Sequence, residues 1–180
     1  MIIGKYSKDI IERAKKIEIF LLDVDGVMTD GMLPYDKHGN SLKLFNVKDG
    51  FGIFLLKKAG LKCVIITAKS ARTVTLRAKD LKINKVYGDY HYKIKAYEDI
   101  KKRFNVSDEA LCFIGDDLID IPVLKRVGLA VCPSDAVSYA KTYAHFTAEN
   151  KGGRGAIREV CDLILNAKGL WDNVTADYFK

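Results

Sequence analysis

The sequence lacks the features of a membrane protein, a secreted protein or a zinc-binding protein. It contains no apolar run of membrane length, and its N-terminal stretch MIIGKYSKDIIERAKK has no apolar centre of the secretion-signal type. Its four cysteines form no C-x-x-C pair and its three histidines are isolated, so we expect neither a disulfide framework nor a zinc site. We therefore expect a cytoplasmic protein with reduced cysteines and no membrane contact.

Proline and tryptophan are also scarce, with 3 and 1 in 180 residues, whereas 48% of the chain is hydrophobic and 29% is charged. This composition is typical of a globular protein, and the length suits a single domain over residues 1–180. The net charge of +7 comes from cations that are scattered along the expected helices. Scattered cations are more often solvated helix faces than a nucleic-acid stripe, so we expect no nucleic acid but a field that attracts small anions.

Short aliphatic runs alternate with longer amphipathic stretches along the chain, the pattern of βα units on a parallel sheet. We predict strands at 17–22, 62–66, 85–87, 110–114 and 129–131, with a short edge strand near 145–147. We predict helices at 49–59 closed by Gly60, 71–81 capped by Ser70, 93–104, 119–127 with Pro122 in its first turn, and 156–165. The tail, about 169–180, shows no convincing periodicity. The expected fold is Rossmann-like α/β, with helices on both faces of the sheet.

One segment, about residues 32–45, breaks this rhythm. Residues 32–35 and 41–45 flank a glycine-containing turn at 36–40, which predicts a projecting β-hairpin in place of a cap domain. Its apolar residues are Met32, Leu33, Pro34, Tyr35, Leu42, Leu44 and Phe45. An isolated ribbon would not keep this surface in water, so we expect a homo-oligomer, most simply a tetramer, whose hairpins and tails enclose the sites. A tail packed on its own subunit is the alternative.

Two carboxylates, Asp23 and Asp25, follow the first apolar strand in the run IFLLDVDGVMTDG. Residues i and i+2 of a strand point to the same side, so both carboxylates leave the carboxyl end of a buried strand, where open parallel sheets bind ligands. Two like charges this close need a cation, which predicts Mg²⁺ or a similar hard ion. A surface turn rich in Asp and Gly is the alternative, and the preceding apolar residues argue against it.

Further polar residues stand at the ends of later strands. The fourth strand is followed by Asp116, Asp117 and Asp120, a second acidic cluster that can complete the ligands of the ion. Thr67 ends the second strand and Lys93 opens the helix after the third. Each is unremarkable alone. Together with a metal they provide the donors and positive charge that a transferred phosphoryl group needs.

In this order the residues resemble the haloacid dehalogenase superfamily, whose pattern is D-x-D, then Ser or Thr, then Lys, then an acidic pair. The resemblance covers the whole chain. More narrowly, the segments DVDGVMTDG, FNVKDGFGI, GDDLIDIPVL, VGLAV and GGRGAIREVCDLIL resemble the 3-deoxy-D-manno-octulosonate 8-phosphate phosphatases. This resemblance implies a Mg²⁺-dependent phosphatase that acts on a small phosphorylated sugar acid in lipopolysaccharide precursor synthesis, and it favours a homotetramer.

The resemblance also implies roles for the acidic residues. Asp23 would attack phosphorus and form an aspartyl-phosphate, and Asp25 would protonate the leaving alkoxide and then activate water. Asp23 and Asp116 would bind Mg²⁺ through their side chains, and Asp25 through its backbone carbonyl. Asp117 and Asp120 would orient Lys93 and metal-bound waters.

The phosphoryl oxygens would be bound by Thr67 and Lys93. The implied substrate-binding residues are Asp25, Asn46, Val47, Lys48, Asp49, Gly50, Lys69, Arg77 and Lys93. The chain departs from the family at two places: it reads Thr67-Ala68-Lys69 where members commonly read Thr-Gly-Arg, and one residue is inserted between Gly88 and Lys93. The role of Arg154, in a glycine-rich loop that could meet an anion, stays open.

Three rival functions remain. An N-acylneuraminate 9-phosphate phosphatase is the nearest, because its substrate differs mainly in side-chain substituents. A phospho-receiver module also places acidic residues, Thr and Lys around Mg²⁺, but no D-x-D follows its first strand. A catalytically inactive regulatory subunit would be expected to lose Asp23, Asp25 or Lys93, and all three are present.

Overall fold

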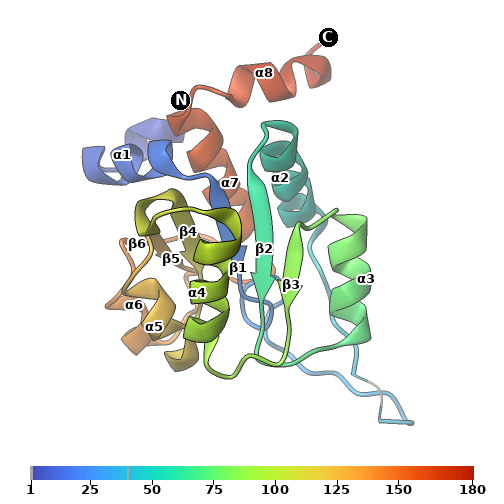
Figure 1. The fold of residues 1–180 in the computed structure, drawn as a ribbon. Helices are drawn as coiled ribbons and strands as arrows, with labels where there is room; N and C mark the ends of the chain where they lie inside the picture. The colour runs from blue at the N-terminus through green and yellow to red at the C-terminus, as the bar shows by residue number, and fades with distance from the viewer. Residues whose placement is uncertain (1, 40) are drawn as a thin grey trace.

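The computed structural model describes residues 2–39 and 41–180, which form a six-stranded sheet in the order β3-β2-β1-β4-β5-β6 (Figure 1). The strands are β1 (Ile19–Leu22), β2 (Lys62–Ile66), β3 (Lys85–Tyr87), β4 (Leu111–Ile114), β5 (Leu129–Cys132) and β6 (Phe146–Thr147). Each neighbouring pair is parallel, so the carboxyl ends of the strands meet at one edge of the sheet. The predicted parallel sheet is confirmed, and β1 lies in its middle.

Helices cover both faces of the sheet (Figure 1). The α-helices are α1 (Lys8–Lys16), α2 (Val47–Lys58), α3 (Arg72–Asp80), α4 (Lys93–Phe104), α5 (Ile121–Leu124), α6 (Ser138–Lys141), α7 (Ala156–Ala167) and α8 (Trp171–Thr175). The 3₁₀ turns are η1 (Ile2–Lys5), η2 (Asp108–Ala110), η3 (Leu118–Asp120) and η4 (Ala176–Tyr178).

Alternate residues of the buried strands belong to two separate hydrophobic cores. Phe20 and Leu22 of β1 pack with α1, α2, α3 and α7, whereas Ile19 and Leu21 pack with α4, α5 and α6. This alternation is the period of two that a strand imposes on its side chains. A sheet buried on both faces explains why its strands read as continuous aliphatic runs.

Several local predictions need correction. The predicted helix 119–127 is wrong: the 3₁₀ turn η3 comes first, and α5 covers only Ile121–Leu124, because Asp120 turns its carboxylate back to the preceding loop. The predicted cap of α3 is also wrong, since Ala71 is the N-cap residue and Ser70 instead donates its backbone N–H to Asp89. Gly60 closes α2 as predicted, with φ of +88°.

Three α-helices of the described chain, α1, α6 and α8, were not predicted from the sequence. α1 begins after Ser7, whose hydroxyl oxygen accepts the N–H of Ile10, and it buries Ile10 and Ala14. α8 lies in the tail. The tail packs on its own chain, where Asp177 pairs with Lys58 of α2 at 3.3 Å, and it lies at the end of the sheet opposite the carboxyl ends of the strands (Figure 1).

Segment 32–45 projects from the carboxyl edge of the sheet (Figure 1). Among its described residues the pairing reduces to one antiparallel bridge, Tyr35 with Ser41, and one further hydrogen bond from the Leu42 N–H to the Pro34 carbonyl at 3.0 Å. Asn40 of the predicted turn lies outside the described residues. The predicted strands are therefore almost absent, because no neighbouring strand pairs with this ribbon.

In the described part of the chain, no helix is both long enough and apolar enough to cross a membrane.

Candidate functional site

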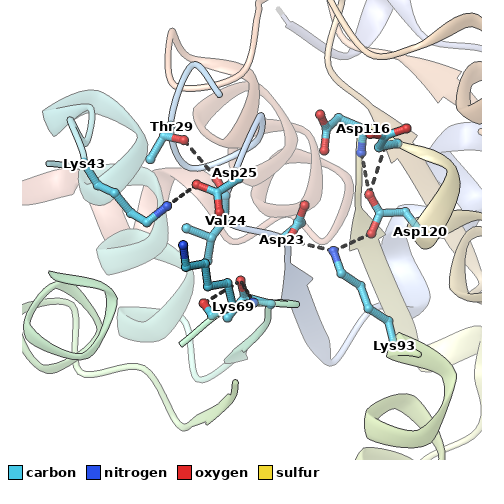
Figure 2. Close-up of polar contacts among 11 residues, drawn as sticks. Asp23, Val24, Asp25, Thr29, Lys43, Lys69, Lys93, Asp116 and Asp120 are labelled. Carbon is cyan, nitrogen blue, oxygen red and sulfur yellow. Dashed lines mark hydrogen bonds and ion pairs between the residues drawn. The ribbon is translucent and has the colours of Figure 1, made fainter. Parts of the chain in front are cut away.

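The centre of the candidate site is a buried lysine between two carboxylates (Figure 2). Lys93, the first residue of α4, is only 1% exposed, and its Nζ lies 2.6 Å from Asp23 and 2.6 Å from Asp120. Asp23 follows β1 directly, and its backbone N–H donates to the carbonyl of Ile114 at 3.1 Å. The sheet therefore fixes the position of Asp23, and α4 carries Lys93 to it.

A second set of contacts fixes the acidic loop after β4. One carboxylate oxygen of Asp120 binds Lys93, and the other accepts the N–H groups of Asp116 and Asp117 at 2.8 and 3.1 Å. Asp116 approaches the first strand because Gly26 has no side chain: a Cβ there would lie 2.0 Å from Asp116 Oδ2. Gly26 also has φ of +83°, a conformation that favours glycine.

Asp23, Asp116 and Asp120 offer oxygen atoms that lie within 4.8 Å of one another. Burial, followed by the charge of Asp120, raises the pKa of Asp23 to about 7 although Lys93 opposes the shift. Burial and the charges of Asp23 and Asp120 raise the pKa of Asp116 to about 8. The single ammonium of Lys93 therefore does not balance the three carboxylates of the cluster. Closely placed carboxylate oxygens are the ligands of a hard divalent cation, so the residues present fit Mg²⁺.

Asp25 has a partner that the sequence did not reveal. Its carboxylate pairs with the ammonium of Lys43, which reaches it from segment 32–45 (Figure 2). The Asp25 side chain is 38% exposed, whereas that of Lys43 is 3% exposed. A lysine in a projecting ribbon gives no sequence signal of this kind, because only the fold turns it inward.

The remaining residues predicted at the phosphate end lie at the carboxyl edge of the sheet. Thr67 follows β2, is 2% exposed, and its hydroxyl accepts the N–H of Lys69 at 3.4 Å. Asp117 is exposed and caps η3 by accepting the N–H of Leu118 at 2.6 Å. Asp120 is thus the residue that holds Lys93, and the structure does not bring Asp117 to that lysine.

The predicted sugar-side residues divide into two groups. Asn46 caps α2 by accepting the N–H groups of Lys48 and Asp49 at 2.8 and 3.4 Å. Asp49 is buried and faces away toward α7, where it accepts the N–H groups of Gly155 and Arg158 at 3.2 and 2.8 Å. Burial raises the pKa of Asp49, and these two donors lower it in part. Both side chains therefore support the backbone of the site.

Arg77 also supports this backbone. Its guanidinium donates to the carbonyl of Asn46 at 3.3 Å, and a Cβ on Gly50 would lie 2.3 Å from it. Lys48, Lys69 and Val47 are exposed, and Val47 reaches 81%. Of the cations predicted on the sugar side, Lys48 and Lys69 are therefore the ones whose side chains are exposed to an incoming anion.

The glycine-rich loop after β6 packs beside the first strand's end. The N–H of Gly153 donates to the carbonyl of Val27 at 2.8 Å, and a Cβ on Gly152 would lie 1.8 Å from the carbonyl oxygen of Gly26. Arg154 is exposed and pairs with Asp30 at 3.2 Å. The glycines therefore permit close backbone contact, whereas the Arg154 side chain lies on the surface.

The parallel α/β fold with this aspartate and lysine arrangement defines a class of hydrolases, and comparison with known proteins gives the same class. The family model of haloacid dehalogenase-like hydrolases matches residues 82–159. The 3-deoxy-D-manno-octulosonate 8-phosphate phosphatase of Yersinia pestis is 41% identical over 172 residues, which cover 96% of this chain and 92% of the relative. That of Escherichia coli K12 is 40% identical over 169 residues, covering 94% and 90%.

Solved structures agree. The Moraxella catarrhalis phosphatase of the same name, in complex with magnesium, phosphate and KDO, superposes with a TM-score of 0.93 at 32% identity, covering 96% of this chain and 99% of that one. The Yersinia pestis structure gives 0.91 at 41% identity, covering 93% and 90%. This chain belongs to the haloacid dehalogenase-like hydrolases, in the family of the 3-deoxy-D-manno-octulosonate 8-phosphate phosphatases.

Proposed function

We propose that the protein is a Mg²⁺-dependent phosphatase that hydrolyses 3-deoxy-D-manno-octulosonate 8-phosphate to the free sugar acid and phosphate, in lipopolysaccharide precursor synthesis. The observation that carries the proposal is the contact of buried Lys93 with Asp23 and Asp120, inside a carboxylate cluster that fits a hard cation. Such a site holds a nucleophile and a cation at the place where a phosphoryl group would bind.

The reaction has two steps on this chain's residues. Asp23 attacks phosphorus, the bond from phosphorus to the sugar oxygen breaks, and Asp25 gives that oxygen its proton. In the second step Asp25 takes a proton from water, which attacks the aspartyl-phosphate and releases phosphate. Thr67 and Lys93 donate to the phosphoryl oxygens. Asp23, Asp116 and the backbone carbonyl of Asp25 would hold Mg²⁺, which would supply further positive charge for those oxygens.

Support for the sugar acid comes from the relatives, whose names state this substrate and which match this chain over more than nine-tenths of its length. The exposed cations Lys48 and Lys69 would meet the sugar carboxylate, with Arg77 holding the segment 46–50 behind them. Lys69 stands where relatives commonly carry arginine, so this contact would be made by a single charge and not by a fork.

We further propose a single-domain enzyme that works as a homotetramer in the cytoplasm. The apolar side chains of segment 32–45 support association, since Met32 is 70% exposed and Leu44 69%. The buried, unpaired state of all four cysteines suits a reducing compartment. Because the tail packs on α2 of its own chain, the proposal leaves the covering of the site to the hairpins.

Phosphate release from a panel of sugar-acid phosphates, with and without Mg²⁺, tests this proposal. We expect the octulosonate 8-phosphate to give the highest kcat/KM, with N-acylneuraminate 9-phosphate as the nearest competitor, and no release from either without the metal. A higher kcat/KM for the neuraminate would move the assignment to that substrate. No phosphate release from any member would overturn the phosphatase assignment itself.

A further inference from the structure

Most described residues of segment 32–45 are exposed, and Lys43 is the one charged residue among them that is not. Leu42 and Leu44, on either side of Lys43, are 52% and 69% exposed, whereas the Lys43 side chain is 3% exposed. A lysine on an exposed ribbon normally keeps its ammonium in water, since burying a charge without a partner is costly. The inward orientation of Lys43 therefore needs a compensating contact.

That contact is the carboxylate of Asp25 (Figure 2). Within the described chain, Lys43 is the only side chain that the structure pairs with this carboxylate. Asp25 stands three residues beyond the end of β1, and its side chain is 38% exposed. By contrast Asp23, two residues earlier, is held by Lys93 from a helix that packs on the sheet.

The contact also uses only one of the two carboxylate oxygens. Lys43 pairs with Oδ1 of Asp25, so Oδ2 stays available to exchange a proton with a substrate oxygen or a water. A carboxylate that must serve both steps has to point at the same place in each, and an error of about 1 Å in such a position can cost about 100-fold in rate.

We propose that Lys43 is a positioning residue for Asp25, so that the seating of segment 32–45 on the site sets the direction of the acid–base carboxylate. This inference rests on the proposed function, because it takes Asp25 as the proton donor and acceptor. It gives the projecting segment a part in the chemistry in addition to covering the substrate.

The test compares Lys43→Met and Lys43→Arg with Lys37→Met, which removes the same charge from an exposed position on the same segment. Each variant is assayed with Mg²⁺ on the octulosonate 8-phosphate and on p-nitrophenyl phosphate. Light scattering and thermal melting show whether assembly and fold are kept. Rapid mixing separates the first release of nitrophenolate from later turnovers.

Nitrophenolate leaves without a proton, so the first step on that substrate does not need Asp25, whereas the second step always does. We expect Lys43→Met to keep the rate of the first nitrophenolate release but to lower later turnover about 10- to 100-fold. On the sugar phosphate we expect kcat to fall by a similar factor with little change in KM. Lys43→Arg should recover most of the rate, and Lys37→Met should match the unmodified protein.

Two results would overturn the inference. A raised KM with unchanged kcat would mean that Lys43 binds substrate directly, and equal behaviour of Lys43→Met and Lys37→Met would mean that it has no part in the reaction. If the unmodified protein hydrolyses p-nitrophenyl phosphate but not the octulosonate phosphate, the substrate assignment fails. The variants then still test Lys43 on the nitrophenyl ester.

Discussion

The D-x-D pair is held by two lysines from very different parts of the molecule. Lys93 is the first residue of α4, which packs against the sheet. Its ammonium binds Asp23 at the carboxyl edge of the sheet. Lys43 binds Asp25 from segment 32–45, whose described residues make one bridge and expose most of their apolar surface. The packed sheet and α4 thus fix the surroundings of Asp23, the proposed nucleophile. The surroundings of Asp25, the proposed acid–base residue, depend on a ribbon with little support of its own.

We expect the largest effect at Asp23, the residue of the D-x-D pair that the sheet and α4 hold in place. Asp23→Asn removes the proposed nucleophile, and we expect turnover to fall by roughly 10⁴-fold or more. The fold should persist, since burial already raises the pKa of this carboxyl to about 7 and the amide has nearly the same shape. Steady-state phosphate release and thermal melting measure the two effects.

Asp172→Asn is the matched control, because Asp172 is exposed in α8, at the end of the sheet opposite the carboxyl ends of the strands. We expect it to keep most of the activity. Activity in Asp23→Asn close to that of this control would rule out the covalent mechanism.

Removal of the metal should act on the same half. We expect a chelator to abolish activity and Mg²⁺ to restore it, because Asp23 and Asp116 lie close together with raised pKa values and need a cation to stay ionised together. Ca²⁺ should inhibit, since a larger ion with more ligands can hold the attacking carboxylate by both oxygens. Equal rates in Ca²⁺ and Mg²⁺ would contradict this account of the site.

The ribbon-dependent half should respond differently. In Asp25→Asn we expect Asp23 to become phosphorylated and then to be hydrolysed slowly, with turnover lowered roughly 10²- to 10⁴-fold. Acid quenching and mass measurement of the intact protein would detect the added phosphoryl group. Failure to find the phosphorylated form on p-nitrophenyl phosphate, which needs no acid in the first step, would place the loss before Asp25 acts.

The same division separates what the sequence could predict from what it could not. Strand ends, the D-x-D pair and Lys93 follow local rules, because aliphatic runs define buried strands and parallel strands share one carboxyl edge. Lys43 was missed because its burial depends on how the ribbon turns, and no periodicity records that. Asp49 lies in a substrate-like motif, yet its partners Gly155 and Arg158 come from a distant helix.

We expect the smallest effect at Glu159, which lies in α7 and contacts the segment just before the glycine-rich loop. Glu159 of α7 accepts hydrogen bonds from the side chains of Lys5, Tyr6 and Asn150 and from the N–H groups of Glu149 and Asn150. It thereby ties the N-terminal turn to the start of the glycine-rich loop. We expect Glu159→Gln to lower the free energy of unfolding by about 1–2 kcal/mol at neutral pH, since a charged acceptor is replaced by a neutral one.

The pH dependence of this loss has a definite sign. Burial alone would raise the pKa of Glu159, but the hydrogen bonds from Asn150, Glu149 and Lys5 outweigh it and hold the pKa below the ordinary 4.5. A carboxyl with a depressed folded pKa stabilises the protein above its unfolded pKa and loses that contribution as pH falls through the folded value. Denaturant unfolding from pH 7 to pH 3 should therefore show the two proteins converging below about pH 4.5. A difference that stays constant over this range would mean that Glu159 acts through packing and not through its charge.

Because Glu159 touches none of the reacting residues, kcat of the variant at neutral pH should stay close to that of the unmodified protein. A large fall in kcat would show that the glycine-rich loop, like the ribbon, positions the chemistry.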